Sequence, residues 1–447
     1  MVLALLVAAG AFTASIAQPS DEARAARADA TERDYRATLD RLGLGSLRSG
    51  ADGWNREAPN AANYDEARVG SAGPLPPLLV MAEGGRVVSA ADWRLRRRAE
   101  LVALLEREMY GRVPDGAPEL IWETESVERR SKGRIPMVTR RLIGRPAQAS
   151  ADALPLAVEL AVTLPVSADG PVPLVLELGF PEGFRFPGAP RPNSPAPDWT
   201  DRVAARGWGY AILVPATVQP DDGAGLAEGV VGFTAAGRPR EPGDWGALRA
   251  WAWGASRALD HLSADPAVDA RRVAVAGLSR YGKAALVAMA FDERFAIGLI
   301  GSSGAGGAKL LRRDFGERLE NLTASGEYHW FAPNFLRYGG PLTVRELPVD
   351  AHSLIALVAP RPLFIGAGNF DADGWVDPRG SWEAARAASD VYRLLGERGL
   401  VGDTYPAINE LRDRGRIAFR QHSGGHTNAP NWPAFLDFAA REWGRGQ

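Results

Sequence analysis

Five short apolar runs between residues 174 and 365 constrain the fold more than any other feature of this chain. They are Leu174–Leu178, Tyr210–Val214, Val273–Ala276, Ile297–Ile300 and Leu363–Ile365. The runs lack polar alternation, as is typical of strands that are buried on both faces of a parallel sheet. Patterns with helical spacing lie between them, at Gly246–Leu262, Lys283–Ala290 and Gly380–Leu395. The sequence therefore predicts an α/β fold with a mostly parallel central sheet between two layers of helices.

The N-terminal part of the chain predicts an exported protein with an extension before its main domain. Val2–Ala17 is apolar and ends in Ser-Ile-Ala, which resembles a signal-peptidase site, although no positive residue precedes it. We expect residues 1–17 to be a signal peptide and the protein to be periplasmic or secreted; an apolar tail is the alternative. Residues 18–74 read as a polar extension and residues 75–447 as the α/β domain. No other segment resembles a membrane-spanning helix.

The amino-acid composition excludes several kinds of chemical site. The 447 residues include no cysteine, which excludes disulfides, thiolate metal sites and cysteine nucleophiles. The formal net charge of −2 gives no indication of a nucleic-acid or membrane partner. Only five histidines are available as general bases, so serine, histidine and carboxylate side chains have to carry any covalent chemistry.

A strand that runs directly into a helix carries the strongest chemical signal. In Val273–Lys283 the strand ends at Gly277-Leu-Ser279 and a helix follows. A nucleophile elbow needs small residues around the serine, and Gly277 and Gly282 meet this need, although Tyr281 stands where a second glycine is usual. We therefore expect Ser279 to be a nucleophile, with the N–H of Arg280 directed to an oxyanion hole. The alternative is an ordinary turn in which the serine caps the helix.

Two permanent cations follow the serine. Arg280 and Lys283 lie three residues apart and therefore on one face of the predicted helix. A pocket for a neutral ester has little need of both, whereas a substrate with anionic or hydroxyl-rich groups could use them. A solvated helix face is the alternative for both residues.

The general base should follow the nucleophile and the acid in the chain, since that order is typical of the α/β-hydrolase fold. Only His422 and His426 come late enough, in a glycine-rich loop after the strand-like run Ile417–Arg420. We expect His426 to be the base and His422 to support the loop through hydrogen bonds. These elements refine the fold prediction to an α/β-hydrolase three-layer sandwich.

The acid should lie in the loop after Leu363–Ile365, where three aspartates occur. Asp377 precedes Pro378 and a helix, so helix capping explains it. Asp371 and Asp373 remain, and Asp373 is the preferred acid. A calcium site in this loop is an alternative, but the spacing does not match an EF-hand.

With these parts placed, the chain from about residue 75 onward resembles the glucuronoyl esterases of carbohydrate esterase family 15. The strings that carry the resemblance are Gly-Leu-Ser-Arg-Tyr-Gly-Lys at 277–283, Ser-Gly-Glu-Tyr-His-Trp-Phe at 325–331, Ala-Leu-Val-Ala-Pro-Arg-Pro at 356–362, Asp-Gly-Trp-Val-Asp-Pro at 373–378 and Gly-Gly-His-Thr at 424–427. The resemblance implies hydrolysis of esters between 4-O-methyl-glucuronic acid on xylan and lignin alcohols, without a metal or cofactor. It implies that Ser279 attacks, Arg280 lines the oxyanion hole, Lys283 and Glu317 bind sugar hydroxyls, and Trp375 is a sugar platform.

The chain departs from parts of the family pattern. Some members carry the acidic residue just after the strand that follows the elbow, but the corresponding stretch here, 301–307, has no carboxylate. Other members use the later aspartate, which corresponds to Asp373. Leu278 stands where fungal members have cysteine, which agrees with the absence of disulfides.

Two other functions remain open on the sequence alone. An acetyl xylan esterase would use the same triad but would leave Lys283 and Trp375 without a role. A non-catalytic carbohydrate-binding member of the fold would fit the missing glutamate, but not an intact serine, histidine and aspartate. As partners we expect glucuronoxylan or lignin-carbohydrate esters, and we expect a monomer.

Overall fold

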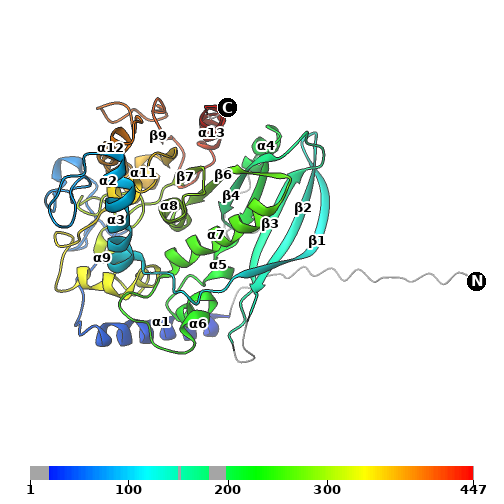
Figure 1. The fold of residues 1–447 in the computed structure, drawn as a ribbon. Helices are drawn as coiled ribbons and strands as arrows, with labels where there is room; N and C mark the ends of the chain where they lie inside the picture. The colour runs from blue at the N-terminus through cyan, green and yellow to red at the C-terminus, as the bar shows by residue number, and fades with distance from the viewer. Residues whose placement is uncertain (1–19, 149–152, 181–197, 446–447) are drawn as a thin grey trace, which may run out of the picture.

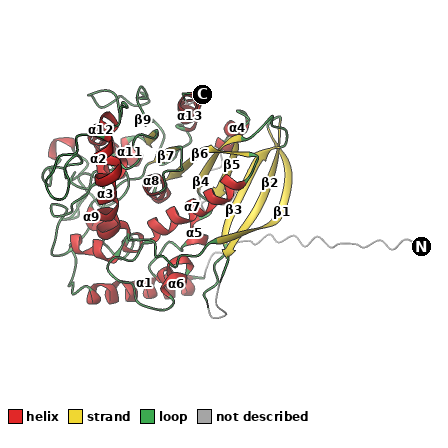
Figure 2. Cartoon of the chain, viewed as in Figure 1, coloured by secondary structure: helices red, strands yellow, loops and turns green. Residues whose placement is uncertain are grey.

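A nine-stranded sheet forms the centre of the molecule, which is described by a computed structural model for residues 20–148, 153–180 and 198–445 (Figures 1 and 2). The strand order is β1-β2-β3-β5-β4-β6-β7-β8-β9. The six strands from β4 onward pair in parallel with one another. They are β4 (Val172–Leu178), β5 (Gly209–Leu213), β6 (Val268–Leu278), β7 (Ile297–Gly301), β8 (Leu363–Ala367) and β9 (Ile417–Gln421). The predicted α/β fold with a mostly parallel sheet is confirmed.

Three antiparallel strands at one edge were not expected from the sequence. They are β1 (Leu120–Lys132), β2 (Ile135–Pro146) and β3 (Val158–Pro165), and they are the long strands at the right of Figure 2. Most residues of β1 are exposed or half-buried, and many of them are charged. Charged side chains are a common way to keep an edge strand from pairing with another chain, and they also hide the apolar signal of a strand.

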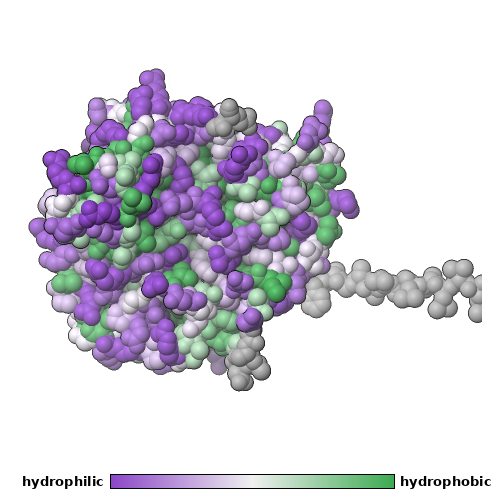
Figure 3. All heavy atoms as spheres, in the orientation of Figure 1, coloured by the Kyte–Doolittle hydropathy of each residue, from purple (hydrophilic) through white to green (hydrophobic). Residues whose placement is uncertain are grey.

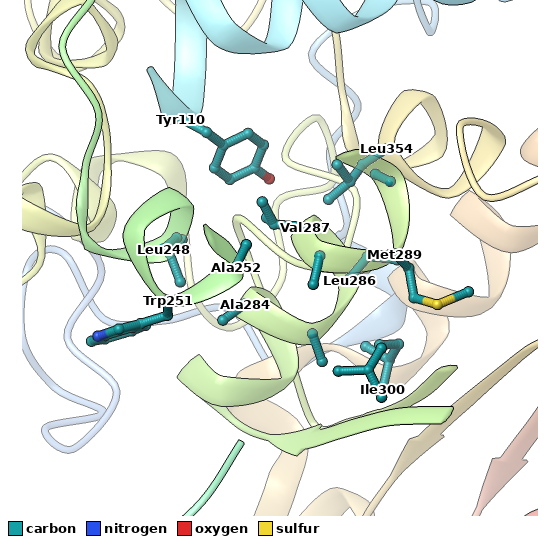
Figure 4. Close-up of a cluster of buried hydrophobic side chains, with 14 of the residues drawn as sticks. Tyr110, Leu248, Trp251, Ala252, Ala284, Leu286, Val287, Met289, Ile300 and Leu354 are labelled. Carbon is teal, nitrogen blue, oxygen red and sulfur yellow. The ribbon is translucent and has the colours of Figure 1, made fainter. Parts of the chain in front are cut away.

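Helices cover both faces of the parallel strands. In β4, Leu174 and Leu176 join the core with α7 (Ala247–Ala264) and α8 (Arg280–Phe291), part of which is drawn in Figure 4. Val175 points to the other face and joins a second core that includes α4 (Trp199–Ala204) and α13 (Trp432–Gly444). Successive residues of a strand point to opposite faces, so these two cores define the three layers.

The other described helices surround this framework. They are α1 (Asp21–Arg41), α2 (Ala90–Asp92), α3 (Arg98–Leu105), α5 (Pro215–Val218), α6 (Gly229–Ala235), α9 (Leu319–Leu322), α10 (Ala351–Ala356), α11 (Phe370–Asp373) and α12 (Pro378–Leu394). Within the described ranges, no helix combines the length and the apolar character needed to cross a bilayer. Figure 3 shows hydrophilic and hydrophobic side chains mixed over the visible face.

The described part of the predicted extension, residues 20–74, packs against the rest of the protein. Leu39 of α1 is buried in the main core, and the hydroxyl of Tyr35 donates to the carbonyl of Thr323 at 2.9 Å. Arg48 Nη2 donates to the carbonyl of Leu342 at 2.8 Å. These contacts tie the segment to the sequence region that follows β7. The predicted signal peptide, residues 1–17, lies outside the described residues.

Candidate active site

Ser279 occupies a strained turn between β6 and α8. Its φ of 59° and ψ of −131° are unusual for a residue with a side chain. A side chain at Gly277 would overlap the carbonyl of Tyr281, and a Cβ at Gly282 would lie 2.7 Å from the carbonyl oxygen of Gly301. The serine side chain makes no capping hydrogen bond to α8, which speaks against the simple helix-cap alternative. The turn thus has the geometry that a nucleophile elbow requires.

Asp373 and His426 form the hydrogen-bonded pair that an acid and base would need. His426 Nδ1 lies 2.7 Å from Asp373 Oδ1. The other carboxylate oxygen, Oδ2, accepts from Ser302 Oγ at 2.5 Å and from the N–H of Gly368 at 2.6 Å. A carboxylate is an acceptor, so Nδ1 carries a proton and Nε2 has its lone pair free. The contact expected between these two side chains is therefore present; their catalytic roles stay predictions.

The other two aspartates of the loop have different surroundings. Asp371 is exposed. Asp377 accepts from the N–H of Gly380 at 2.9 Å, as expected for a helix cap, and from Arg313 Nε at 2.9 Å. Among the described residues, no group of three or more histidine and acidic side chains is arranged to hold a metal ion. The aspartates therefore do not converge as calcium ligands would.

His422 shapes the loop that presents His426. Its Nδ1 accepts from the N–H of Gly424 at 3.1 Å, and its Nε2 lies 2.8 Å from the carbonyl oxygen of Thr427. Burial lowers the pKa of His422, so the ring stays neutral in this bridging position. Asn428 Nδ2 donates to the carbonyl of Gly277 at 3.1 Å and ties the same loop to the elbow. His422 thus supports the loop, as expected.

Ser279 and His426 are not joined by a hydrogen bond among the described residues. The side chain of His426 is 41% exposed, which leaves the imidazole room to move. Catalytic hydrogen bonds are often long in structures without substrate and shorten when the substrate binds. Chemistry at Ser279 would require Nε2 of the imidazole to approach Oγ.

Lys283 is buried beside the serine. Its side chain is 5% exposed, which speaks against the alternative of a solvated helix face. Nζ donates to the carbonyl of Ala305 at 2.5 Å and to Glu317 Oε2 at 3.2 Å. The same Oε2 accepts from the N–H of Ala305 at 2.8 Å. The structure thus brings together the two residues that were expected to bind sugar hydroxyls.

Arg280 is held by a carboxylate that sequence analysis missed. Arg280 Nη1 donates to Asp221 Oδ2 at 2.5 Å, and its guanidinium lies 5.3 Å from the centroid of the Trp330 ring. Asp221 Oδ1 lies 3.0 Å from His329 Nε2 and accepts from Trp330 Nε1 at 2.7 Å. Burial opposes ionisation of Asp221, but hydrogen bonds and the nearby Arg280 outweigh it and lower the pKa of this carboxyl. A charged Asp221 fixes the guanidinium next to the elbow.

Trp375 and Glu327 line a cavity of about 530 Å³. The carbonyl of Trp375 accepts from the N–H of Glu317 at 2.9 Å, which connects this cavity to the Lys283–Glu317 pair. Glu327 is a second residue that sequence analysis did not assign. Burial, followed by the nearby charge of Glu317, raises its pKa to about 8. Below that pH the carboxyl is protonated and can both donate and accept hydrogen bonds. Paired with the face of Trp375, such a group suits a polyhydroxylated ring.

Comparisons with known proteins identify relatives over most of the chain. A family model described as glucuronyl esterase of fungi matches residues 241–396. A carbohydrate esterase from an unknown prokaryotic organism is 35% identical over 410 residues, covering 85% of this chain and 92% of its own. The 4-O-methyl-glucuronoyl methylesterase of Phanerochaete carnosa is 30% identical, with 72% of each chain covered. The structure of a family 15 glucuronoyl esterase from Teredinibacter turnerae superposes with a TM-score of 0.86 at 44% identity, covering 92% of this chain and all of that one.

Proposed function

Because the chain belongs to carbohydrate esterase family 15, the glucuronoyl esterases, we propose that it hydrolyses esters of the glucuronic acid carboxyl group on xylan through an acyl-enzyme on Ser279. Family 15 enzymes are carboxylic ester hydrolases. The observation that carries the proposal is the combination of a serine on a strained elbow with a His426–Asp373 pair held by the neighbouring loops. The alcohol side of the natural ester is proposed to be a lignin alcohol.

In the proposed mechanism, Ser279 and His426 carry the proton transfers. Nε2 of His426 takes the hydroxyl proton as Oγ attacks the ester carbonyl, and Asp373 stabilises the imidazolium that forms. The carbonyl oxygen becomes an oxyanion beside the Arg280 guanidinium and the first N–H of α8. The imidazolium then protonates the leaving alcohol. Water attacks the acyl-enzyme by the same route and releases the free acid.

The buried Lys283 supports a sugar acid, rather than an acetyl group, as the acyl group of the ester substrate. An acetyl group is small and carries no hydroxyl, so it offers no partner to Lys283, Glu317 or Glu327. A glucuronoyl ring brings several hydroxyls to these side chains and an apolar ring face to Trp375. Burial of charged groups is costly, so their presence at the site supports a ligand that uses them.

The proposal is tested by comparing the hydrolysis of benzyl glucuronate with that of 4-nitrophenyl acetate. A glucuronoyl esterase should have the higher kcat/KM on benzyl glucuronate, although acetate is the smaller acyl group and 4-nitrophenol the better leaving group. A clear preference for the acetate ester would contradict the proposal.

Lys283→Ala separates sugar recognition from catalysis. Loss of a charge-assisted hydrogen bond should lower kcat/KM on benzyl glucuronate by an amount that corresponds to about 1.5–3 kcal/mol of transition-state stabilisation. Hydrolysis of 4-nitrophenyl acetate should change little. The substitution also leaves Glu317 without its cation, so thermal unfolding has to be measured in parallel. Equal losses on both substrates in a folded variant would show that Lys283 supports the site in another way.

Asp221 is proposed to position Arg280 for the oxyanion. Asp221→Asn removes the charge that fixes the guanidinium, and we expect kcat on benzyl glucuronate to fall about tenfold with little change in KM. Asp222→Asn is the matched control, since Asp222 pairs with Arg27 at 2.5 Å instead. Similar kinetics for both variants would contradict a positioning role for Asp221.

A further inference from the structure

Trp54 is the most exposed large apolar side chain of the described residues, at 97% exposure. Tryptophan is usually well buried, so an exposed one at a cavity is a candidate for ligand contact. The side chain lines the same cavity of about 530 Å³ as Trp375 and Glu327. Exposed apolar side chains that stand alone are common, so it is the position of Trp54 at this cavity that points to a role in ligand binding.

Hydrogen bonds fix the backbone of the loop that carries Trp54. Asp52 Oδ1 accepts from the N–H of Trp54 at 2.9 Å and from the N–H of Asn55 at 2.8 Å. The backbone of Asp52 bonds across the loop to the carbonyl of Asn60 at 2.9 Å and to the N–H of Ala62 at 2.8 Å. Side-chain and backbone bonds thus fix the turn just before the indole.

This loop is docked on the sugar platform itself. A Cβ on Gly53 would lie 2.6 Å from the Trp375 ring, so only glycine allows this approach. Tyr64, at the other end of the loop, makes edge contacts with Phe315 and Phe370 at centroid distances of 5.9 and 6.2 Å. The segment that sequence analysis read as an extension therefore builds a wall of the cavity beside Trp375.

The chemistry of the wall fits a second sugar ring better than a phenyl ring. Arg56 and Asp371 line the cavity together with Trp54 and Phe370, so the cavity wall offers charged donors and acceptors as well as aromatic rings. A pyranose stacks its C–H face on an indole and pairs its hydroxyls with such groups, whereas a phenyl ring would leave them unpaired. The cavity volume lies within the range of about 300–1,000 Å³ that accommodates ligands larger than a single ring.

We propose that Trp54 is the platform of an outer subsite that binds a neighbouring sugar ring of the carbohydrate chain carrying the glucuronoyl ester. The inference rests on the proposed function, because it takes the Trp375 side of the cavity as the glucuronoyl site. It assigns to the N-terminal segment a role in choosing oligosaccharide esters over monosaccharide esters.

The test compares two benzyl esters that differ only in the sugar chain: benzyl glucuronate and the benzyl ester of a glucuronoyl xylotriose. Trp54→Ala should lower kcat/KM on the xylotriose ester about five- to tenfold more than on benzyl glucuronate. Trp54→Phe should recover most of the loss. Leu95→Ala, which removes a side chain that is 79% exposed and does not line this cavity, should behave as wild type on both esters.

A binding experiment separates this inference from the proposed function. Calorimetry with the free acid of glucuronoyl xylotriose, in the Ser279→Ala background, should show weaker binding when Trp54→Ala is added. Equal losses on both benzyl esters, or unchanged affinity in the calorimeter, would overturn the outer subsite. If Trp54→Ala lowered kcat/KM on benzyl glucuronate but not on methyl glucuronate, Trp54 would contact the aromatic leaving group. That result would also overturn the outer subsite. Wild-type protein inactive on every glucuronate ester would instead contradict the proposed function, and the calorimetric result would still decide on Trp54.

Discussion

Ser279→Ala should reduce kcat for glucuronate ester hydrolysis by about four orders of magnitude or more while the protein stays folded. The serine lies on the strained turn between β6 and α8, where its Oγ is not used to cap the helix. Removal of a triad nucleophile leaves only binding and oxyanion stabilisation, which account for the small residual rate. Initial rates on benzyl glucuronate, measured beside the melting temperature, check both parts of this expectation.

A second measurement on the same variant identifies the reacting atom. A serine-directed phosphonate should label the wild-type protein once, on the peptide that contains Ser279, and should not label Ser279→Ala. Ser279→Gly is a useful companion, because glycine adopts the positive φ of this position without strain and should melt no lower than the alanine variant. Near-wild-type turnover in either variant, or labelling elsewhere, would reject Ser279 as nucleophile.

The parallel half of the sheet was predictable, whereas the antiparallel edge was not. Strands such as β7 are buried on both faces and appear in the sequence as unbroken apolar runs. In β1 the exposed positions mix charged residues with the apolar Ile121 and Val127, so the apolar residues form no recognisable alternation. Strands that are buried on both faces are therefore the ones that can be recognised from the sequence.

The triad candidates follow from local patterns, but the residues that position the substrate do not. Ser279 and His426 are next to glycine-rich turns with recognisable order along the chain. Asp221 and Glu327 come from long connections whose path no periodic pattern reveals. The signal for Asp221 was its place after a parallel strand, at the sheet edge where ligands bind. Glu327 lay inside the Ser325–Phe331 string that carried the family resemblance.

The N-terminal extension shows how composition can mislead. Its polar and glycine-rich sequence is typical of a surface connection, and most of its described residues are indeed exposed or half-buried. Tyr35, Leu39 and Leu42 of this segment pack against the core, but they stand among many charged residues, and Gly53 approaches Trp375 from a loop without any periodic pattern. The loop contact with Trp375 therefore becomes visible only in the structure.

Asp373→Asn should abolish most activity because the amide forces the wrong form of His426. Asp373 Oδ2 accepts from the N–H of Gly368 at 2.6 Å, and a backbone N–H can only donate. The amide oxygen of asparagine must therefore face Gly368, which turns the NH₂ group toward Nδ1 of His426. Nδ1 then has to accept, the ring proton moves to Nε2, and the imidazole can no longer take a proton from Ser279. The expected loss in kcat is as large as about 10⁴, the value for the same change in another serine hydrolase.

The neighbouring aspartates provide matched controls for this tautomer argument. Asp371 is exposed, so Asp371→Asn should keep nearly wild-type kcat on benzyl glucuronate, which carries no second sugar ring for the outer subsite. Asp377 caps α12 and pairs with Arg313, so Asp377→Asn should clearly lower the melting temperature and change kcat only mildly. An NMR assignment of the His426 ring nitrogens would follow the tautomer directly, with the proton on Nδ1 in wild type and on Nε2 in Asp373→Asn. If Asp373→Asn kept most of the activity, or the proton stayed on Nδ1, another group would have to serve as the acid.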